Sequence, residues 1–336
     1  MNAGRDINAA TATTRRNFLR WGGASAAAGG LGAAGLLQFD GRAEAASIDV
    51  RLFVNAGLVD VGNGKRIFHR GFSTHADGIG VPGNVIHAVE GDAINVSVTN
   101  NLSEPHSFAI AGVADTGPIR PGVTERISFA APPAGTYLYE DRLDAPVNRL
   151  LGLHGVLVVM PAGAAQVPFA GGPRFVRQYV WVLGVIDPRL HERARLGRPL
   201  GFDPDTFEPS VFLINGRFGD FAEHARDAAP HGRIDEAALI RMVNVGLPVK
   251  SMHFHGNHVV VLSRDAKVLD LRAEKDTVFM APGERVDVLL RFHAPGDAYP
   301  PVRTGHYPVH DHQELTQTLT GGLYPNGMLT QWTLEG

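Results

Sequence analysis

Cysteine is absent from the 336 residues of the chain. Its absence excludes disulfide bonds, thiolate metal ligands and a lipid anchor on a cysteine that follows a signal peptide. Long runs of like charge are also lacking, and the formal net charge is only −3. Neither a nucleic acid nor an anionic membrane surface is therefore indicated as a partner.

Long apolar runs are scarce as well. Residues 24–37 form a small, weakly apolar stretch that is Gly-rich and shorter than the roughly 20 residues that a spanning helix needs. The stretch follows a twin-arginine pattern, Thr14-Arg15-Arg16-Asn17-Phe18-Leu19, and precedes Ala43-Glu44-Ala45, which resembles a cleavage site. We therefore expect residues 1–45 to be a signal peptide read by the twin-arginine export machinery, and a periplasmic protein without a membrane anchor.

The 40 glycines and 22 prolines lie between short apolar runs and favour an all-β fold. Residues 161–173, rich in Ala, Gly and Pro, form the best linker, so we predict one domain over 46–162 and a second over 173–336. Helical structure is expected only around 189–196 and 235–239. The strand-like runs are 85–99, 124–129, 135–139, 153–160, 175–183, 240–245, 259–262, 286–292 and 328–334.

The two predicted domains resemble imperfect copies of one another. A strand-like run at 95–100 has its counterpart at 241–246, and each is followed by a histidine-bearing element, around His106 and His253 respectively. This repetition predicts two Greek-key β-sandwiches.

Two His-x-His pairs, His253-Phe254-His255 and His310-Asp311-His312, carry most of the functional information. Side chains alternate between the two faces of a β-strand, so each pair projects both imidazoles to one side and Asp311 to the other. Four imidazoles delivered by two extended segments predict a metal site. His258, two residues after Gly256, is a candidate for orienting a ligand. The competing interpretation is that the four histidines bind no metal.

The lone histidines are interpreted as structural residues, except that His106 and His154 stay candidate ligands. The structural set is His69, His75, His87, His191, His224, His231 and His293.

Taken together, the chain resembles the multicopper oxidase family, which is built from cupredoxin β-sandwiches. The resemblance rests on residues 81–84, 90–92, 212–217 and 281–287, together with the two His-x-His pairs in their order along the chain. It implies two cupredoxin-like domains, copper as the cofactor, and O₂ or a small molecule as the substrate. By the same resemblance we expect a homotrimer, in which His106 or Glu140 of one subunit completes a neighbour's site.

Several residues differ from the family's copper ligands, and these differences limit the kind of copper site that we expect. Lys250 and Asp311 stand where the family has a histidine and the cysteine of its blue, type 1 copper, so we expect that site to be missing. In the first domain, Ser107-Phe108 and Glu140-Asp141-Arg142 replace further histidine pairs, which leaves no full eight-histidine cluster.

We predict a periplasmic copper-dependent oxidoreductase with a type 2 or type 3-like centre at His253, His255, His310 and His312, with His106 as a less certain ligand. Glu140 and Asp311 are its candidate proton carriers. The alternative is a non-enzymatic cupredoxin that serves in copper binding or tolerance or in an envelope structure.

Overall fold

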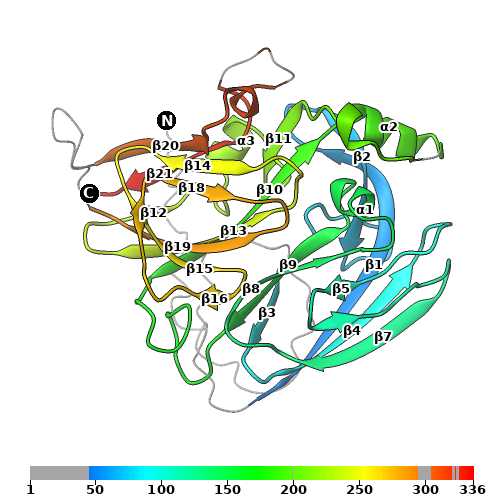
Figure 1. Ribbon diagram of the computed structural model, residues 1–336, viewed down its shortest axis with the longest axis horizontal. Helices are drawn as coiled ribbons and strands as arrows, with labels where there is room; N and C mark the ends of the chain where they lie inside the picture. The colour runs from blue at the N-terminus through cyan, green and yellow to red at the C-terminus, as the bar shows by residue number, and fades with distance from the viewer. Residues whose placement is uncertain (1–44, 199, 294–303, 320–321, 323–324) are drawn as a thin grey trace, which may run out of the picture. The chain divides into compact units, whose positions relative to one another are not determined.

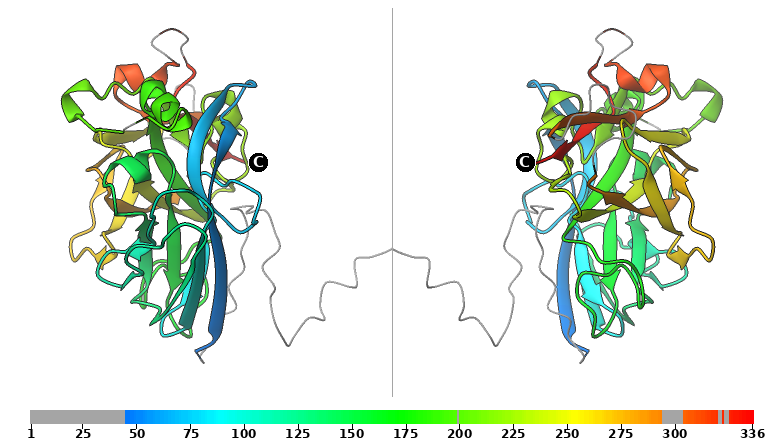
Figure 2. Two further views of the ribbon diagram at one scale, coloured as in Figure 1. Left: turned by 90° about the vertical axis from the view of Figure 1, so that its right-hand side faces the viewer. Right: turned by 90° about the vertical axis from the view of Figure 1, so that its left-hand side faces the viewer.

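The computed structural model describes residues 45–198, 200–293, 304–319, 322 and 325–336, and the expected signal peptide lies outside these residues apart from Ala45. The chain is built almost entirely of β-strands (Figure 1), which confirms the all-β prediction. Figure 2 shows the same predominance of strands from two further sides. None of the helices in the described ranges is long and apolar enough to cross a membrane.

The N-terminal half forms two sheets. In the first, with the order β2-β1-β4-β7, β1 and β4 are parallel; in the second, with the order β3-β9-β8-β5-β6, β3 and β9 are parallel. The strands are β1 (Ser47–Asp60), β2 (Arg66–Ser73), β3 (Ile86–Val89), β4 (Ala93–Asn100), β5 (Ala109–Ile110), β6 (Ala114–Asp115), β7 (Thr124–Ala130), β8 (Gly135–Glu140) and β9 (His154–Met160).

The C-terminal half repeats this plan. Its first sheet has the order β11-β10-β13-β19-β15-β16, with β17 on β15, and its second has the order β12-β21-β20-β14-β18. The parallel pairs β10–β13 and β12–β21 match β1–β4 and β3–β9. The strands are β10 (Arg177–Ile186), β11 (Val211–Ile214), β12 (His231–Gly232), β13 (Ala237–Asn244), β14 (Lys250–Phe254), β15 (Val259–Arg264), β16 (Lys267–Val268), β17 (Glu274–Lys275), β18 (Thr277–Met280), β19 (Arg285–Arg291), β20 (Gly305–Asp311) and β21 (Leu329–Leu334).

Helices are short and lie between strands. The predicted helical segment near residue 189 is present as α2, which begins after Asp187 because that carboxylate accepts a hydrogen bond from the Arg189 amide at 2.9 Å. The predicted helix over 235–239 is wrong: Asp235 has a φ of +71° and β13 already begins at Ala237, paired with β19. The helical segments are α1 (Val147–Leu150), α2 (Pro188–Arg195), α3 (Asp220–Glu223), and the 3₁₀ turns η1 (Pro204–Thr206) and η2 (Glu314–Gln317).

Strand β9 is buried on both faces because it lies between two cores. Leu157 and Val159 belong to the core of the N-terminal half, whereas Val156 and Val158 pack with residues of β10, β13, β15 and β19 in a core that joins the halves. The same alternation puts Ile240 of β13 in the core of the C-terminal half and Leu239 in the joining core. A strand buried on both faces reads as a continuous apolar run, as β9 does.

A buried guanidinium links the halves inside this joining core. Arg241 is fully buried and donates to Asp287 at 2.9 Å and to Thr136 of β8 at 3.0 Å, while Thr136 donates to Asp287 at 2.6 Å. Ser263 and Gln178 complete the polar cluster. Because the charges are paired and hydrogen-bonded, their burial is tolerated, but the loss of one partner leaves the other charge uncompensated.

We therefore expect Arg241→Met to lower the free energy of unfolding by about 3–5 kcal/mol, since it leaves the Asp287 carboxylate buried and unpaired. Urea denaturation measures the change. Arg241→Met combined with Asp287→Asn should be less destabilised than Arg241→Met alone, and the exposed Arg195→Met is the control. Equal effects of the buried and the exposed arginine would contradict this account.

Three buried histidines stabilise the junction between α2, β2 and β9 in their neutral form. Burial lowers the pKa of His69 to about 3 and those of His154 and His191 to about 4. Each donates its Nδ1–H to a main-chain carbonyl, of Ile67, Arg149 and Phe68 respectively. These contacts agree with a structural role for His69 and His191.

The lowered pKa values predict acid sensitivity. The unfolded chain takes up protons at these histidines below about pH 6.5, whereas the folded chain does so only near pH 3–4, so stability is complete above pH 6.5 and falls as the pH drops toward 4. His191→Asn keeps a donor for Phe68 and should make the slope of the unfolding free energy between pH 6 and pH 4.5 shallower by up to about 1.4 kcal/mol per pH unit. Urea titrations at several pH values measure it, with exposed His224→Asn as the control; an unchanged slope for His191→Asn would refute the assignment.

Candidate metal centre

The four paired histidines gather on one face of the β12-β21-β20-β14-β18 sheet. His253 of β14 lies directly opposite His310 of β20, and His255 and His312 follow at the ends of these strands. The ring centroid of His253 lies 4.7 Å from that of His255, 5.1 Å from His312 and 5.7 Å from His310. The His255 and His310 rings are 5.1 Å apart.

Main-chain hydrogen bonds extend the strand pairing to the two outer histidines. The His255 amide donates to the Pro308 carbonyl at 3.0 Å, and the His312 amide donates to the Ser251 carbonyl at 2.8 Å. The indole of Trp332 donates to the His255 carbonyl at 2.8 Å. Gly256 then turns the chain away with a φ of +67°, a conformation that favours glycine. The backbone that carries the four imidazoles is thus held on both strands.

The cluster lies on an open face of the sheet. His255 and His312 are exposed, whereas His253 and His310 are half-buried. Two cavities at the junction between the halves, one beside His69 and His154 and one beside Glu140 and Arg149, do not include the cluster. A small molecule therefore reaches these imidazoles directly from solvent.

Electrostatics favour the neutral, metal-binding form of the inner histidines. Burial is the main cause that lowers the pKa of His253 and of His310, and the neighbouring imidazoles lower both further. A neutral imidazole has one nitrogen lone pair available for a metal.

The hydrogen bonds of His255 and His310 determine which of their ring nitrogens carry a proton in the metal-free protein. His255 Nε2 and His310 Nε2 are 2.9 Å apart, so one donates to the other. His310 Nδ1 lies 3.2 Å from the Asp311 carbonyl and donates to it, which leaves His310 Nε2 as the acceptor. His255 therefore carries its proton on Nε2, and a metal ion must displace this hydrogen bond.

The opposite face of the same strands is filled by a buried ion pair. Asp311 and Lys250 are both fully buried, with 3.2 Å between Oδ2 and Nζ, and Asp311 also accepts from the Ser251 amide and hydroxyl. Burial lowers the pKa of Lys250, and Asp311 opposes this. The side chain of Asp311 thus points away from the four imidazoles, and its placement gives no support to the predicted role as a proton carrier.

The other predicted residues lie apart from the cluster. Glu140, the second predicted proton carrier, is in β8 of the N-terminal half and pairs with Arg149 at 3.0 Å. His258 is exposed, and its amide donates to the Asn257 side chain. Among the described residues, the His258 ring is not one of those that contact the four histidines.

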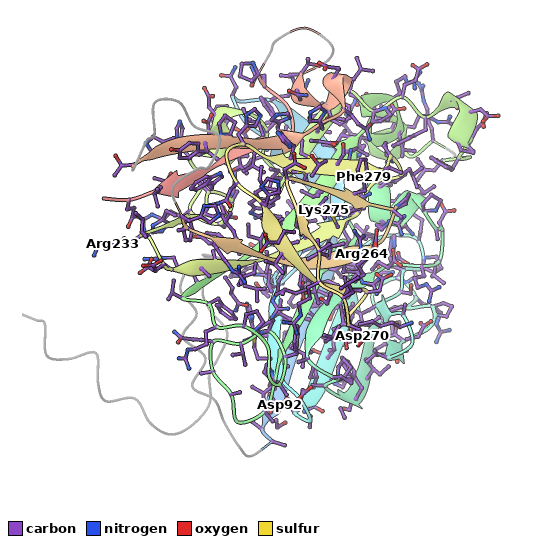
Figure 3. All side chains as sticks on the ribbon, turned by 60° about the vertical axis from the view of Figure 1, so that its left-hand side comes forward. Asp92, Arg233, Arg264, Asp270, Lys275 and Phe279 are labelled. Carbon is purple, nitrogen blue, oxygen red and sulfur yellow. The ribbon has the colours of Figure 1, made fainter. Side chains whose placement is uncertain are left out.

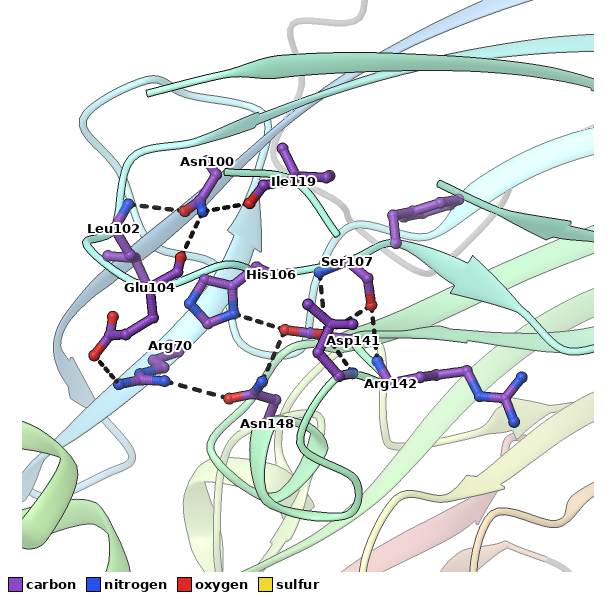
Figure 4. Close-up of polar contacts among 12 residues, drawn as sticks. Arg70, Asn100, Leu102, Glu104, His106, Ser107, Ile119, Asp141, Arg142 and Asn148 are labelled. Atoms are coloured by element: carbon purple, nitrogen blue, oxygen red, sulfur yellow. Dashed lines mark hydrogen bonds and ion pairs between the residues drawn. The ribbon is translucent and has the colours of Figure 1, made fainter. Parts of the chain in front are cut away.

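His106 belongs to a separate buried network in the N-terminal half (Figure 4). It donates from Nδ1 to Asp141 at 2.6 Å, and Asp141 also accepts from Ser107 and Asn148. His106 is fully buried, and its Nε2 has no hydrogen-bond partner among the described residues. The described contacts place His106 with Asp141 and not with the four histidines.

A threonine and an aspartate beside the cluster were missed by the sequence analysis. Thr277 of β18 lies directly across from His253, with 2.9 Å between Oγ1 and His253 Nδ1, and an Asp276 carboxylate oxygen lies 3.9 Å from the same nitrogen. The run 277–280 (Thr-Val-Phe-Met) is short and mostly apolar, as a strand is, but the tertiary fold sets which strand it pairs with.

Comparison with known proteins shows similarity to copper oxidases and copper-containing reductases. Residues 76–163 match the multicopper oxidase family. The chain is 26% identical over 270 residues to "Laccase-18" of Oryza sativa subsp. japonica, covering 72% of this chain and 42% of the laccase. It is 28% identical over 153 residues to the "Copper-containing nitrite reductase" of Neisseria gonorrhoeae, covering 42% of this chain and 37% of the reductase.

These matches support a divergent protein of the multicopper oxidase type. Its fold matches the blue copper oxidase from Nitrosomonas europaea with a TM-score of 0.72 at 23% identity, covering 85% of each chain. This similarity confirms the cupredoxin-like all-β fold. The chain spans about two-fifths of the length of the rice laccase and of the gonococcal reductase.

The similarity to this family and to copper-containing relatives implies copper as the cofactor. The donor set fits: four neutral or exposed imidazoles are suitable ligands for copper, and no thiolate is available anywhere in the sequence. In the described residues, no three His, Cys, Asp or Glu side chains already converge as a metal site. A bound ion therefore requires another arrangement of the imidazoles, and it competes with the His255–His310 hydrogen bond.

Proposed function

We propose that this protein binds copper at His253, His255, His310 and His312 and acts as an oxidoreductase on O₂ or another small molecule without a type 1 copper. The observation that carries the proposal is the gathering of four imidazoles on one open face of the β14–β20 pair. Bound copper supplies one-electron redox chemistry. The chain supplies imidazole donors on a rigid sheet and direct access from solvent.

The residues on the buried face support the proposal that the protein has no type 1 copper. A type 1 centre needs a thiolate, and the position between His310 and His312 holds a carboxylate that is already paired with Lys250. Because a thiolate relay is lacking, the electron donor must reach the histidine face itself. Exposed Phe279 and Leu315 on β18 and η2 offer apolar contacts for such a donor.

Export and assembly are further parts of the proposal. The twin-arginine pattern supports a periplasmic location. The resemblance to trimeric two-domain relatives supports a homotrimer. In such a homotrimer, His106 or Glu140 of one subunit completes a neighbour's site; Asp141 holds His106 Nδ1, and His106 Nε2 has no hydrogen-bond partner among the described residues.

The second candidate is a non-enzymatic copper-binding protein, in copper tolerance or in an envelope structure. Three buried side chains, Lys250, Asp311 and Asp141, favour this candidate. Hydrogen bonds and ion pairs hold them in place without a metal. The two candidates share the copper site and differ in turnover.

We expect the protein exported from copper-supplemented cells to hold stoichiometric copper. His253→Ala combined with His310→Ala removes one donor from each strand and should abolish this copper and the stabilisation it gives, about 2.7 kcal/mol at a copper concentration 100-fold above Kd. Elemental analysis and thermal unfolding measure both. His306→Ala is the control, since His306 lies on the same strand and contacts Thr333 instead. A copper-free wild-type protein, or unchanged copper in the double variant, would exclude the site.

Aerobic oxidation of a phenol or of cuprous ion separates the two candidates. The copper-loaded protein should consume O₂ with the substrate, without an intense blue absorption, and the double variant should fall to the background rate. Oxygen consumption and absorption spectra are the measurements. Bound copper with no turnover above the double variant would favour the non-enzymatic candidate.

A further inference from the structure

His253 is the central histidine of the cluster. Its ring contacts all three of the others, and it lies within β14 itself, whereas His255 and His312 follow their strands. The sheet order places β20 on one side of β14 and β18 on the other. The orientation of the His253 ring therefore affects its pairs with the three other histidines, as that of His310 also does.

The β18 side of the His253 ring is occupied by Thr277 and Asp276. Thr277 is its direct cross-strand neighbour, and its hydroxyl oxygen lies within hydrogen-bond distance of His253 Nδ1, at 2.9 Å. An Asp276 carboxylate oxygen lies 3.9 Å from the same Nδ1. The Asp276 carbonyl accepts from the Phe254 amide at 2.8 Å, which fixes its main chain beside the end of β14.

A proton held on Nδ1 leaves the lone pair on Nε2, at the other side of the ring from Thr277. Histidines that bind metals usually donate their other ring N–H to a carboxylate, a carbonyl or a water, which fixes the tautomer and the ring orientation. The Thr277 hydroxyl together with the Asp276 carboxylate provides such an acceptor.

The two carboxylates singled out from the sequence do not serve this purpose. Asp311 is bound to Lys250 on the buried face, and Glu140 is bound to Arg149 in the other half. Asp276 is about half exposed, and its ion-pair contact in the described structure is with His253. Figure 3 labels Lys275 and Phe279, which flank this segment on β17 and β18.

We propose that Thr277 and Asp276 are positioning residues that hold His253 in the Nδ1–H tautomer with Nε2 directed to the copper site. This inference rests on the proposed copper-binding function, but its first test does not. The tautomer is a property of the metal-free protein.

Long-range ¹H–¹⁵N NMR of the metal-free full chain tests the tautomer directly. The wild-type His253 should show a protonated Nδ1 and an unprotonated Nε2. Thr277→Val and Asp276→Asn, which nearly preserve side-chain volume, should each shift His253 toward the Nε2–H tautomer, and Thr277→Ser should restore the wild-type pattern. Asp270→Asn, an exposed carboxylate in the loop before β17 (Figure 3), should change nothing.

Copper titration of the same variants gives the second measurement. Thr277→Val and Asp276→Asn should weaken copper binding about 10- to 100-fold, and the electron paramagnetic resonance spectrum of bound Cu²⁺ should change, while Thr277→Ser and Asp270→Asn keep the wild-type values. An unchanged His253 tautomer in both Thr277→Val and Asp276→Asn overturns this inference while leaving the copper site intact. A wild-type protein that binds no copper overturns the proposed function, and the NMR result still decides the role of Thr277 and Asp276.

Discussion

Side-chain alternation along β14 and β20 is the constraint on which the chemistry of this protein depends. It sends His253 and His310 to the open face of the sheet and Lys250 and Asp311 to the buried face. The cluster can therefore be reached from solvent, whereas Lys250 and Asp311 are buried. A shift of one residue in the register of either strand would exchange the two faces and bury the imidazoles.

Buried charge is concentrated where the fold needs specific partners. Arg241–Asp287, Lys250–Asp311 and His106–Asp141 are each almost completely removed from solvent. Isolated charges in such places are strongly unfavourable, so each aspartate accepts further hydrogen bonds from neighbouring hydroxyl or amide groups. Asp311 pairs with Lys250 across the buried face and accepts hydrogen bonds from the Ser251 amide and hydroxyl.

The layered sheets explain why the histidine face is open. Strands β9 and β13 are covered on both sides because they form the junction between the halves. The β14–β20 sheet has only its inner face in a core, so its outer face is free for chemistry. Its central imidazole is supported from the edge strand β18 by Thr277 and Asp276.

Much of this was determined by the sequence alone. Alternating apolar residues and frequent turns predicted the all-β fold and most strands, and the His-x-His spacing predicted that the imidazoles of each pair share a face. These are local consequences of backbone geometry, so they can be read without the fold. The strand at Ala237 was misjudged because its pairing with β19, and not its local propensity, decides its conformation.

Only the tertiary structure decided which side chains meet. Register and sheet order bring β18 beside β14, place Asp276 near His253, and separate the cluster from Glu140, Asp311 and His106. Such contacts join residues that are far apart in the chain. They depend on the pairing of whole strands and the burial of whole faces, which the spacing of residues within one segment does not encode.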